Sequence, residues 1–115
     1  PKRFALNFVG LNQLKLETFQ KYALQKIASN EALKLQRMIH NENFAVNIHV
    51  KAYDKQGSQH KYSVHMRIES PGHIFNAAQE DWDLNTAMHK TFDNLKNEIK
   101  KRFRGDGGMD KKVFG

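Results

Sequence analysis

Basic side chains crowd one short segment near the carboxyl end of this chain, residues 96–104. The cluster comprises Lys96, Lys100, Lys101, Arg102 and Arg104. Glu98 is the only acidic residue among them, so the segment has a strong positive charge. Such a cluster suits the phosphates of a nucleic acid, because binding releases the counterions condensed on the polyanion. A solvated helix end is the alternative, since cations also stabilise the negative end of the helix dipole.

A second group of basic and imidazole side chains falls at alternating positions within residues 49–67. The group comprises His49, Lys51, Lys61, His65 and Arg67. Alternate residues of a strand point to the same side of a sheet, so these side chains can share one surface. We predict that Lys51, Lys61 and Arg67 contact phosphates on that surface.

Lys26 and Lys90 complete the predicted RNA-binding set, each within a segment of helical periodicity. In the first of these segments Lys21, Lys34 and Arg37 are also spread among polar residues. An ordinary solvated helix surface explains these side chains as well as contact with RNA does.

The other side chains that could bind a metal, catalyse a reaction or stack on a base have simpler structural explanations. His49 and His65 could lie close together, but zinc needs a third ligand and the chain has no cysteine. The carboxylates within residues 80–83 suit the N-terminus of a helix better than acid–base catalysis, and Trp82 suits the edge of the core better than stacking on a base. No nucleophile elbow, HExxH motif or phosphate-binding loop occurs. The sequence therefore predicts no enzyme, no metal, no cofactor and no small-molecule substrate.

The composition fits a basic protein of one domain. With 115 residues, 39% of them hydrophobic, the chain can build a single core. Its formal net charge of +7 predicts a polyanionic partner, and nucleic acid fits better than an anionic membrane, since no segment joins a broad apolar face to a uniformly basic one. No apolar run is long enough to cross a bilayer, and the first residues alternate like a strand rather than a signal peptide. The lack of cysteine fits a cytoplasmic location.

The elements that must position these groups begin with a strand over residues 4–9, ended by Gly10. A helix follows, because apolar residues recur at helical spacing and predict its buried face. This predicted stripe comprises Leu16, Phe19, Tyr22 or Ala23, and Lys26 or Ile27, and it resumes through Leu33, Leu35, Met38 and Ile39. Ser29 and Asn30 weaken the pattern, so we expect either a kinked helix or a helix with a short second one after it.

Strict alternation over residues 44–53 and again over 61–69 predicts two strands joined as a β-hairpin by a polar, glycine-containing turn. Pro71 and Gly72 predict a further turn, and residues 73–78 a fourth strand of uncertain register.

The last helix is the clearest element of the pattern. Asp83 can cap its start, and we expect it to end before Gly105. Its apolar stripe comprises Leu84, Met88, Phe92, Leu95 and Ile99. The glycine-rich remainder, residues 105–115, lacks periodicity and is predicted to be a flexible tail.

The predicted fold class is therefore α+β, in the order β-α-β-β-β-α, with a four-stranded sheet and two helices packed on one face. A single domain spans residues 1–104, and its core is like that of double-stranded-RNA-binding domains. If both helices cover the face of Phe44, Val46 and Ile48, the other face is open to solvent. That open face would hold the second basic group, with Glu69 as its only acid.

Five segments together resemble the hibernation-promoting factor and ribosome-associated inhibitor family, also called the sigma-54 modulation family. They are FALNFVG (4–10), LKLETFQKYALQKI (14–27), FAVNIHVKAY (44–53), PGHIFNAAQ (71–79) and DLNTAMHKTFDNLKNEIKK (83–101). The resemblance covers roughly residues 4–104 and is to the short form of the family. Asn94 and Asn97 stand where members often have Lys or Arg, which shifts the expected contacts toward the cluster at 96–104.

The resemblance implies a non-enzymatic, cytoplasmic protein that is a monomer when free. Such a protein binds rRNA in the mRNA/tRNA channel of the small ribosomal subunit and stabilises inactive, hibernating ribosomes under stress or in stationary phase. The alternative is a double-stranded-RNA-binding module that acts on other structured RNA, because such modules share the α-β-β-β-α core and recognise RNA by shape.

Overall fold

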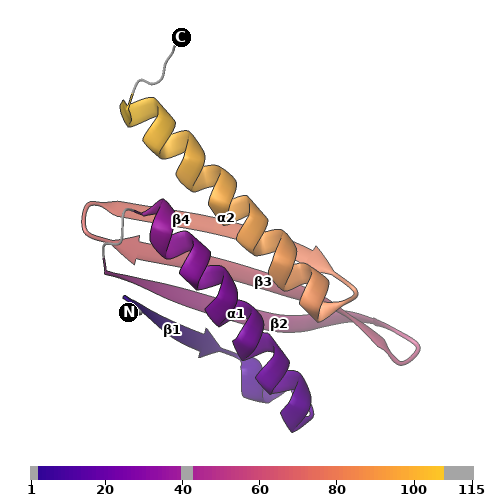
Figure 1. The fold of residues 1–115 in the computed structure, drawn as a ribbon. Helices are drawn as coiled ribbons and strands as arrows, with labels where there is room; N and C mark the ends of the chain where they lie inside the picture. Colours follow the sequence, from indigo (N-terminus) through magenta and orange to yellow (C-terminus); the bar gives the residue numbers. More distant parts are fainter. Residues whose placement is uncertain (1–2, 40–42, 108–115) are drawn as a thin grey trace.

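The computed structural model describes residues 3–39 and 43–107. The elements along the chain are β1 (Phe4–Val9), the 3₁₀ helix η1 (Leu11–Leu14), α1 (Thr18–Met38), β2 (Phe44–Gln56), β3 (Gln59–Ser70), β4 (His73–Asp81) and α2 (Leu84–Gly107). Figure 1 shows both helices lying across the sheet. The predicted α+β class and the order β-α-β-β-β-α are confirmed.

The four strands form one mixed sheet in the order β1-β2-β3-β4. The strands β2, β3 and β4 are joined by tight turns and pair antiparallel, with His49 opposite His65. The first strand pairs parallel to β2, with Phe4 opposite Phe44, because α1 lies between them in sequence and returns the chain to the same end of the sheet.

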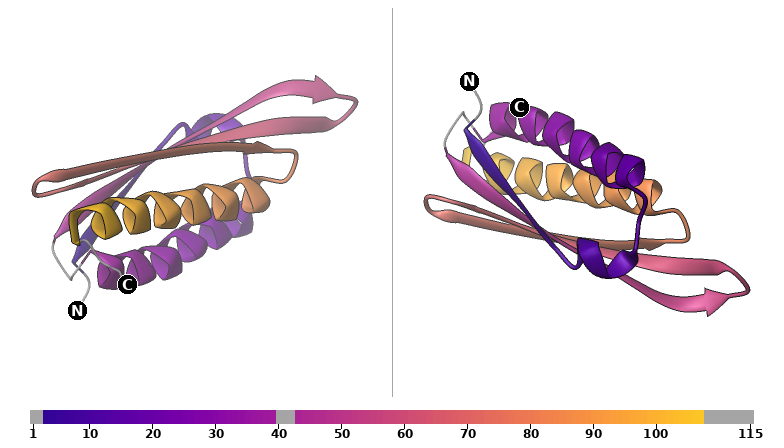
Figure 2. Two further views of the ribbon diagram at one scale, coloured as in Figure 1. Left: turned by 90° about the horizontal axis from the view of Figure 1, so that it is seen from above. Right: turned by 90° about the horizontal axis from the view of Figure 1, so that it is seen from below.

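Both helices pack on the same face of the sheet, and the other face is open (Figure 2). The buried strand residues Val46, Ile48 and Val64 alternate with exposed ones, as predicted. The predicted stripe of the last helix is also confirmed, since Met88, Phe92, Leu95 and Ile99 are almost fully buried. The core therefore lies between the sheet and the two helices.

The first helix is one continuous element, so the predicted alternative of a helix followed by a short second one is wrong. Its start is fixed by a capping box in which the backbone N–H of Glu17 donates to Gln20 Oε1 at 2.8 Å. A helix of this length tolerates Ser and Asn, because packing outweighs their modest helix propensity.

The buried face of α1 also differs from the prediction. Phe19 and Tyr22 are 71% and 65% exposed, whereas smaller residues face the core. The buried apolar row consists of Leu24, Ala28, Ala32 and Leu35. This row has helical spacing too, and its alanines let the helix approach its neighbours closely. The prediction is therefore wrong for Phe19 and Tyr22, whereas the predicted Leu35 and Ile39 are buried.

The last helix begins as predicted, with the Asp83 carboxylate accepting the backbone N–H of Thr86 at 2.8 Å. It continues through Gly107 instead of ending before Gly105, so the predicted end of this helix is wrong. A glycine in a helix costs only about 1 kcal/mol, which a long, packed helix can absorb. The rest of the predicted tail, 108–115, lies outside the described residues. None of the described helices is long and apolar enough to cross a membrane.

Candidate nucleic-acid interface

The open face of the sheet contains more acid than predicted. Because β4 runs to Asp81, Glu80 falls opposite Ser63 on this face, six residues along β3 from Glu69. Lys61 Nζ lies 3.5 Å from Glu80, and Arg67 Nε lies 2.8 Å from Glu69. The predicted face with Glu69 as its only acid is therefore wrong, since β4 is longer than its pattern indicated.

These ion pairs change what the open face offers to a polyanion. A hydrogen bond from Tyr53 and the nearby charge of Lys61 lower the pKa of the Glu80 carboxyl, so it is ionised at neutral pH. Lys51 is exposed and has no ion pair among the described residues. It lies beside His49, whose ring centroid is 6.0 Å from that of His65. Within the described part of the chain, no three His, Cys, Asp or Glu side chains are placed to hold a metal.

Lys96, predicted to bind RNA, lies between the two helices. Its Nζ is 2.5 Å from Glu31 Oε1 of α1 and 3.8 Å from Asp93. Lys34 approaches the same Glu31 carboxylate at 3.2 Å. Burial by itself raises the pKa of the Glu31 carboxyl, but hydrogen bonds from Lys96 and Lys34 outweigh burial and lower that pKa. Lys96 therefore has a structural role in joining α2 to α1.

We expect Glu31→Gln to lower the free energy of unfolding by about 1–2 kcal/mol at neutral pH, because two lysines lose a charged acceptor. The pKa of Glu31 is lowered in the folded state, so this stability is complete above the ordinary pKa of 4.5 and is lost as the pH falls below it. Urea unfolding of both proteins at several pH values measures the difference. Glu98→Gln, at the exposed pair with Lys101, is the control and should change little. A difference that does not depend on pH would contradict this account.

Lys90 is also held by neighbouring groups. Its Nζ donates to the backbone oxygen of Glu80 at 3.0 Å and lies 3.3 Å from Asp81 Oδ2. These contacts tie α2 to the end of β4. The Asp81 carboxyl has a lowered pKa, first because it accepts the backbone N–H of Asp83 and then because of Lys90.

The remaining predicted residues of α2 form the basic helix end, which comprises Lys100, Lys101, Arg102 and Arg104. Lys100 is exposed, and it has no ion pair among the described residues. Lys101 is exposed as well and lies 3.6 Å from Glu98. The Arg102 guanidinium lies over the Phe75 ring, 5.2 Å from its centroid, which fixes the side chain at the edge of β4.

Lys26 lies on the solvent side of α1. The periodicity of the sequence did not identify this side of the helix as a distinct surface. The row that contains it comprises Phe19, Tyr22, Lys26, Leu33 and Arg37. The spacing alone did not show whether this row or the Leu24 row faces the core. Charge did not resolve this either, because Glu31, the only acidic residue of α1, lies in the Leu24 row, where a carboxylate ordinarily indicates a solvent-facing position.

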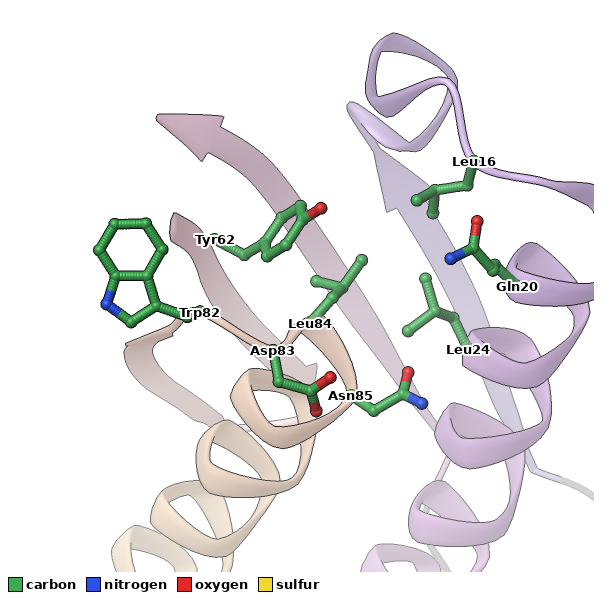
Figure 3. A pocket seen from close by; sticks show the side chains of 8 residues that line it. All are labelled: Leu16, Gln20, Leu24, Tyr62, Trp82, Asp83, Leu84 and Asn85. Atoms are coloured by element: carbon green, nitrogen blue, oxygen red, sulfur yellow. The ribbon is translucent and has the colours of Figure 1, made fainter. Parts of the chain in front are cut away.

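Trp82 lies where β4 meets α2 and is 40% exposed. It lines a hollow with Leu16, Gln20, Leu24 and Tyr62. Figure 3 shows the indole on the opposite side of this hollow from Leu16 and Gln20. The ring therefore covers the margin of the core only in part.

Charge is unevenly distributed along the molecule. Acidic residues lie where β4 meets α2, at Glu80, Asp81 and Asp83, whereas the basic helix end lies about 24 Å along α2. The two helices run in the same general direction, so the C-terminal end of α1, with Arg37, lies at the same end of the molecule (Figures 1 and 2). Arg37 of α1 and the basic helix end of α2 thus lie at the same end of the molecule.

The fold has relatives among solved structures. The N-terminal domain of Protein Y from Thermus thermophilus superposes with a TM-score of 0.58 at 17% identity, covering 85% of this chain and 94% of that one. A ribosomal subunit interface protein from Coxiella burnetii gives a TM-score of 0.48 at 15% identity, covering 86% and 94%. No curated protein sequence matches the chain.

A sequence family covers most of the chain. Residues 16–104 match the family described as Sigma 54 modulation protein / S30EA ribosomal protein. This match extends from the start of the first helix to the basic helix end, and it agrees with the resemblance seen in the sequence. The chain therefore belongs to the Sigma 54 modulation protein / S30EA ribosomal protein family.

Proposed function

We propose that this protein is a ribosome-associated translation inhibitor that binds rRNA in the mRNA/tRNA channel of the small subunit. There it excludes mRNA and tRNA and stabilises inactive ribosomes under stress or in stationary phase. Membership of a ribosomal protein family supports the association with the ribosome.

The observation that supports RNA as the direct partner is the separation of charge along the helices. Most acids near the sheet are matched by a close cation, as at Lys61–Glu80 and Arg67–Glu69. Lys100 of α2 and Lys26 of α1 are exposed and have no such acid among the described residues. Dispersed, unopposed cations bind phosphates through counterion release without reading a base sequence.

The mechanism needs occupancy of a site and no chemical turnover. Folded RNA holds phosphates on both sides of a channel, and a protein with cations at the ends of two helices and on its sheet can contact several strands at once. Bound in this way, the domain occupies the channel and excludes mRNA and tRNA from it.

We expect the protein to inhibit a cell-free translation system in proportion to its molar ratio to ribosomes, with a plateau near one per ribosome. The reason is that a plugged channel requires one bound molecule for each ribosome. Peptide synthesis at increasing protein concentration measures the ratio, with rRNA integrity followed on a gel. Inhibition at a small fraction of the ribosome concentration that grows with time, or cleaved rRNA, would instead indicate an enzyme.

A further inference from the structure

The solvent side of α1 presents a row of aromatic and basic side chains, the outer stripe of α1. The outer stripe comprises Phe19, Tyr22, Lys26, Leu33 and Arg37. Their spacings of three, four, seven and four residues keep them on one side of the helix. This side lies opposite the buried row that begins at Leu24. The outer stripe is about 27 Å long, at 1.5 Å per residue.

Two aromatic rings at its N-terminal end have no role in the core. Phe19 and Tyr22 are one helical turn apart and more exposed than the other exposed large hydrophobic side chains in the described ranges 3–39 and 43–107. Neighbouring exposed aromatic rings mark a contact surface more often than an ordinary solvated helix. Their neighbour Lys26 follows one turn further along α1.

The charges of the outer stripe are of one sign. Glu31, the only acid of α1, is buried against α2 and is held there by Lys96 and Lys34. Lys26 and Arg37 form no ion pair with any residue that the structure describes. The outer stripe thus combines aromatic rings with cations and contains no carboxylate.

This combination fits unpaired nucleotides. An aromatic ring can stack on any base, and neighbouring Lys and Arg neutralise the phosphates between bases. A second copy of this chain is disfavoured as the partner, because a formal net charge of +7 on each copy opposes the contact. An acidic protein would pair with the cations but would gain nothing specific from the π faces of Phe19 and Tyr22.

We infer that the outer stripe of α1 is a platform for unpaired nucleotides, on which Phe19 and Tyr22 stack with bases while Lys26 and Arg37 contact phosphates. This inference rests on the proposed function and extends it, since it places unpaired rRNA bases against α1. Within the ribosome the platform would grip single-stranded segments while the basic helix end contacts backbone phosphates.

Ultraviolet crosslinking of the full chain to purified small subunits tests the contact directly. Stacked aromatic residues crosslink to the base that they touch, and trypsin separates the two rings into peptides 16–21 and 22–26. We expect RNA adducts on both peptides. Adducts confined to peptides of the sheet or of α2 would overturn the inference while leaving ribosome binding intact.

Affinity for a uridine homopolymer provides a second test that does not depend on the ribosome. Phe19→Leu/Tyr22→Leu keeps apolar area but removes both π faces, and we expect binding to weaken by about tenfold or more. Phe19→Tyr/Tyr22→Phe should bind like the unchanged protein. Trp82→Leu, at the exposed aromatic residue away from the stripe, is the control and should have little effect.

The outcomes separate this inference from the proposed function. The platform is overturned if the double leucine variant binds the homopolymer as tightly as the unchanged protein. It is also overturned if the protein binds an acidic protein and the double leucine substitution does not weaken that binding. If the unchanged protein binds the homopolymer through the outer stripe but never sediments with ribosomes, the platform stands and the proposed function fails. Because Phe19 and Tyr22 are both exposed, the variants at these two positions should keep the melting temperature of the unchanged protein.

Discussion

Replacing the basic helix end with glutamine should weaken binding to small ribosomal subunits by about a hundredfold or more at low salt. The variant changes Lys100, Lys101, Arg102 and Arg104. Each lost phosphate contact should also make the slope of log affinity against log salt shallower by about one. Binding of labelled protein to purified subunits at four or five salt concentrations measures both quantities.

Stability should hardly change in this variant, so the loss of binding would not result from unfolding. Lys100, Lys101 and Arg102 are exposed, and exposed substitutions usually change the free energy of unfolding by less than about 0.5 kcal/mol each. Arg102 is the exception, because its contact with the Phe75 ring adds roughly 0.5–1 kcal/mol. If affinity and salt slope both stay unchanged, the basic helix end is not the contact surface, even though the chain belongs to the family.

The open sheet face is best tested by a single substitution and not by the triple substitution that its sequence suggests. Replacing Lys51, Lys61 and Arg67 together would leave Glu69 and Glu80 unopposed and would repel RNA even from a face that never touches it. Lys51→Gln alone removes a cation that has no ion pair among the described residues. A loss of affinity in this single variant would show that the open face also contacts rRNA.

Much of the fold follows from local patterns. Strict alternation located β2 and β3, and the Asp83 cap with the stripe from Leu84 to Ile99 located α2. These signals are strong because each depends only on one strand or helix and on the single face that it buries. The pattern over residues 73–78 did not show that β4 continues to Asp81, and this concealed Glu80 on the open face.

The candidate site was less predictable, because it depends on how elements pack against each other. Nothing local to Lys96 indicates that Glu31, 65 positions earlier in the sequence, lies 2.5 Å away. The face of α1 was likewise ambiguous, since its aromatic row and its Leu24 row both have helical spacing. Packing of α1 against the sheet and the second helix determines which row is buried. Phe19 and Tyr22, predicted to lie in the core, are therefore on the surface.

Binding to ribosomes should depend steeply on salt. A basic domain that contacts about six to ten phosphates loses roughly 10³–10⁵ in affinity between 50 and 200 mM salt, because each contact releases a counterion. This large effect follows directly from the excess of cations over acids on the two helices. A partner held by apolar packing would respond in the opposite direction or not at all, since salt weakens only the electrostatic part of binding.

Sucrose-gradient sedimentation of a lysate with the tagged protein, at low and at high salt, tests this most directly. We predict that the protein sediments with small subunits and whole ribosomes at 50 mM salt and remains at the top of the gradient at several hundred millimolar, with a graded loss in between. The protein staying at the top at every salt concentration, or sedimenting equally with ribosomes at low and high salt, would contradict the account.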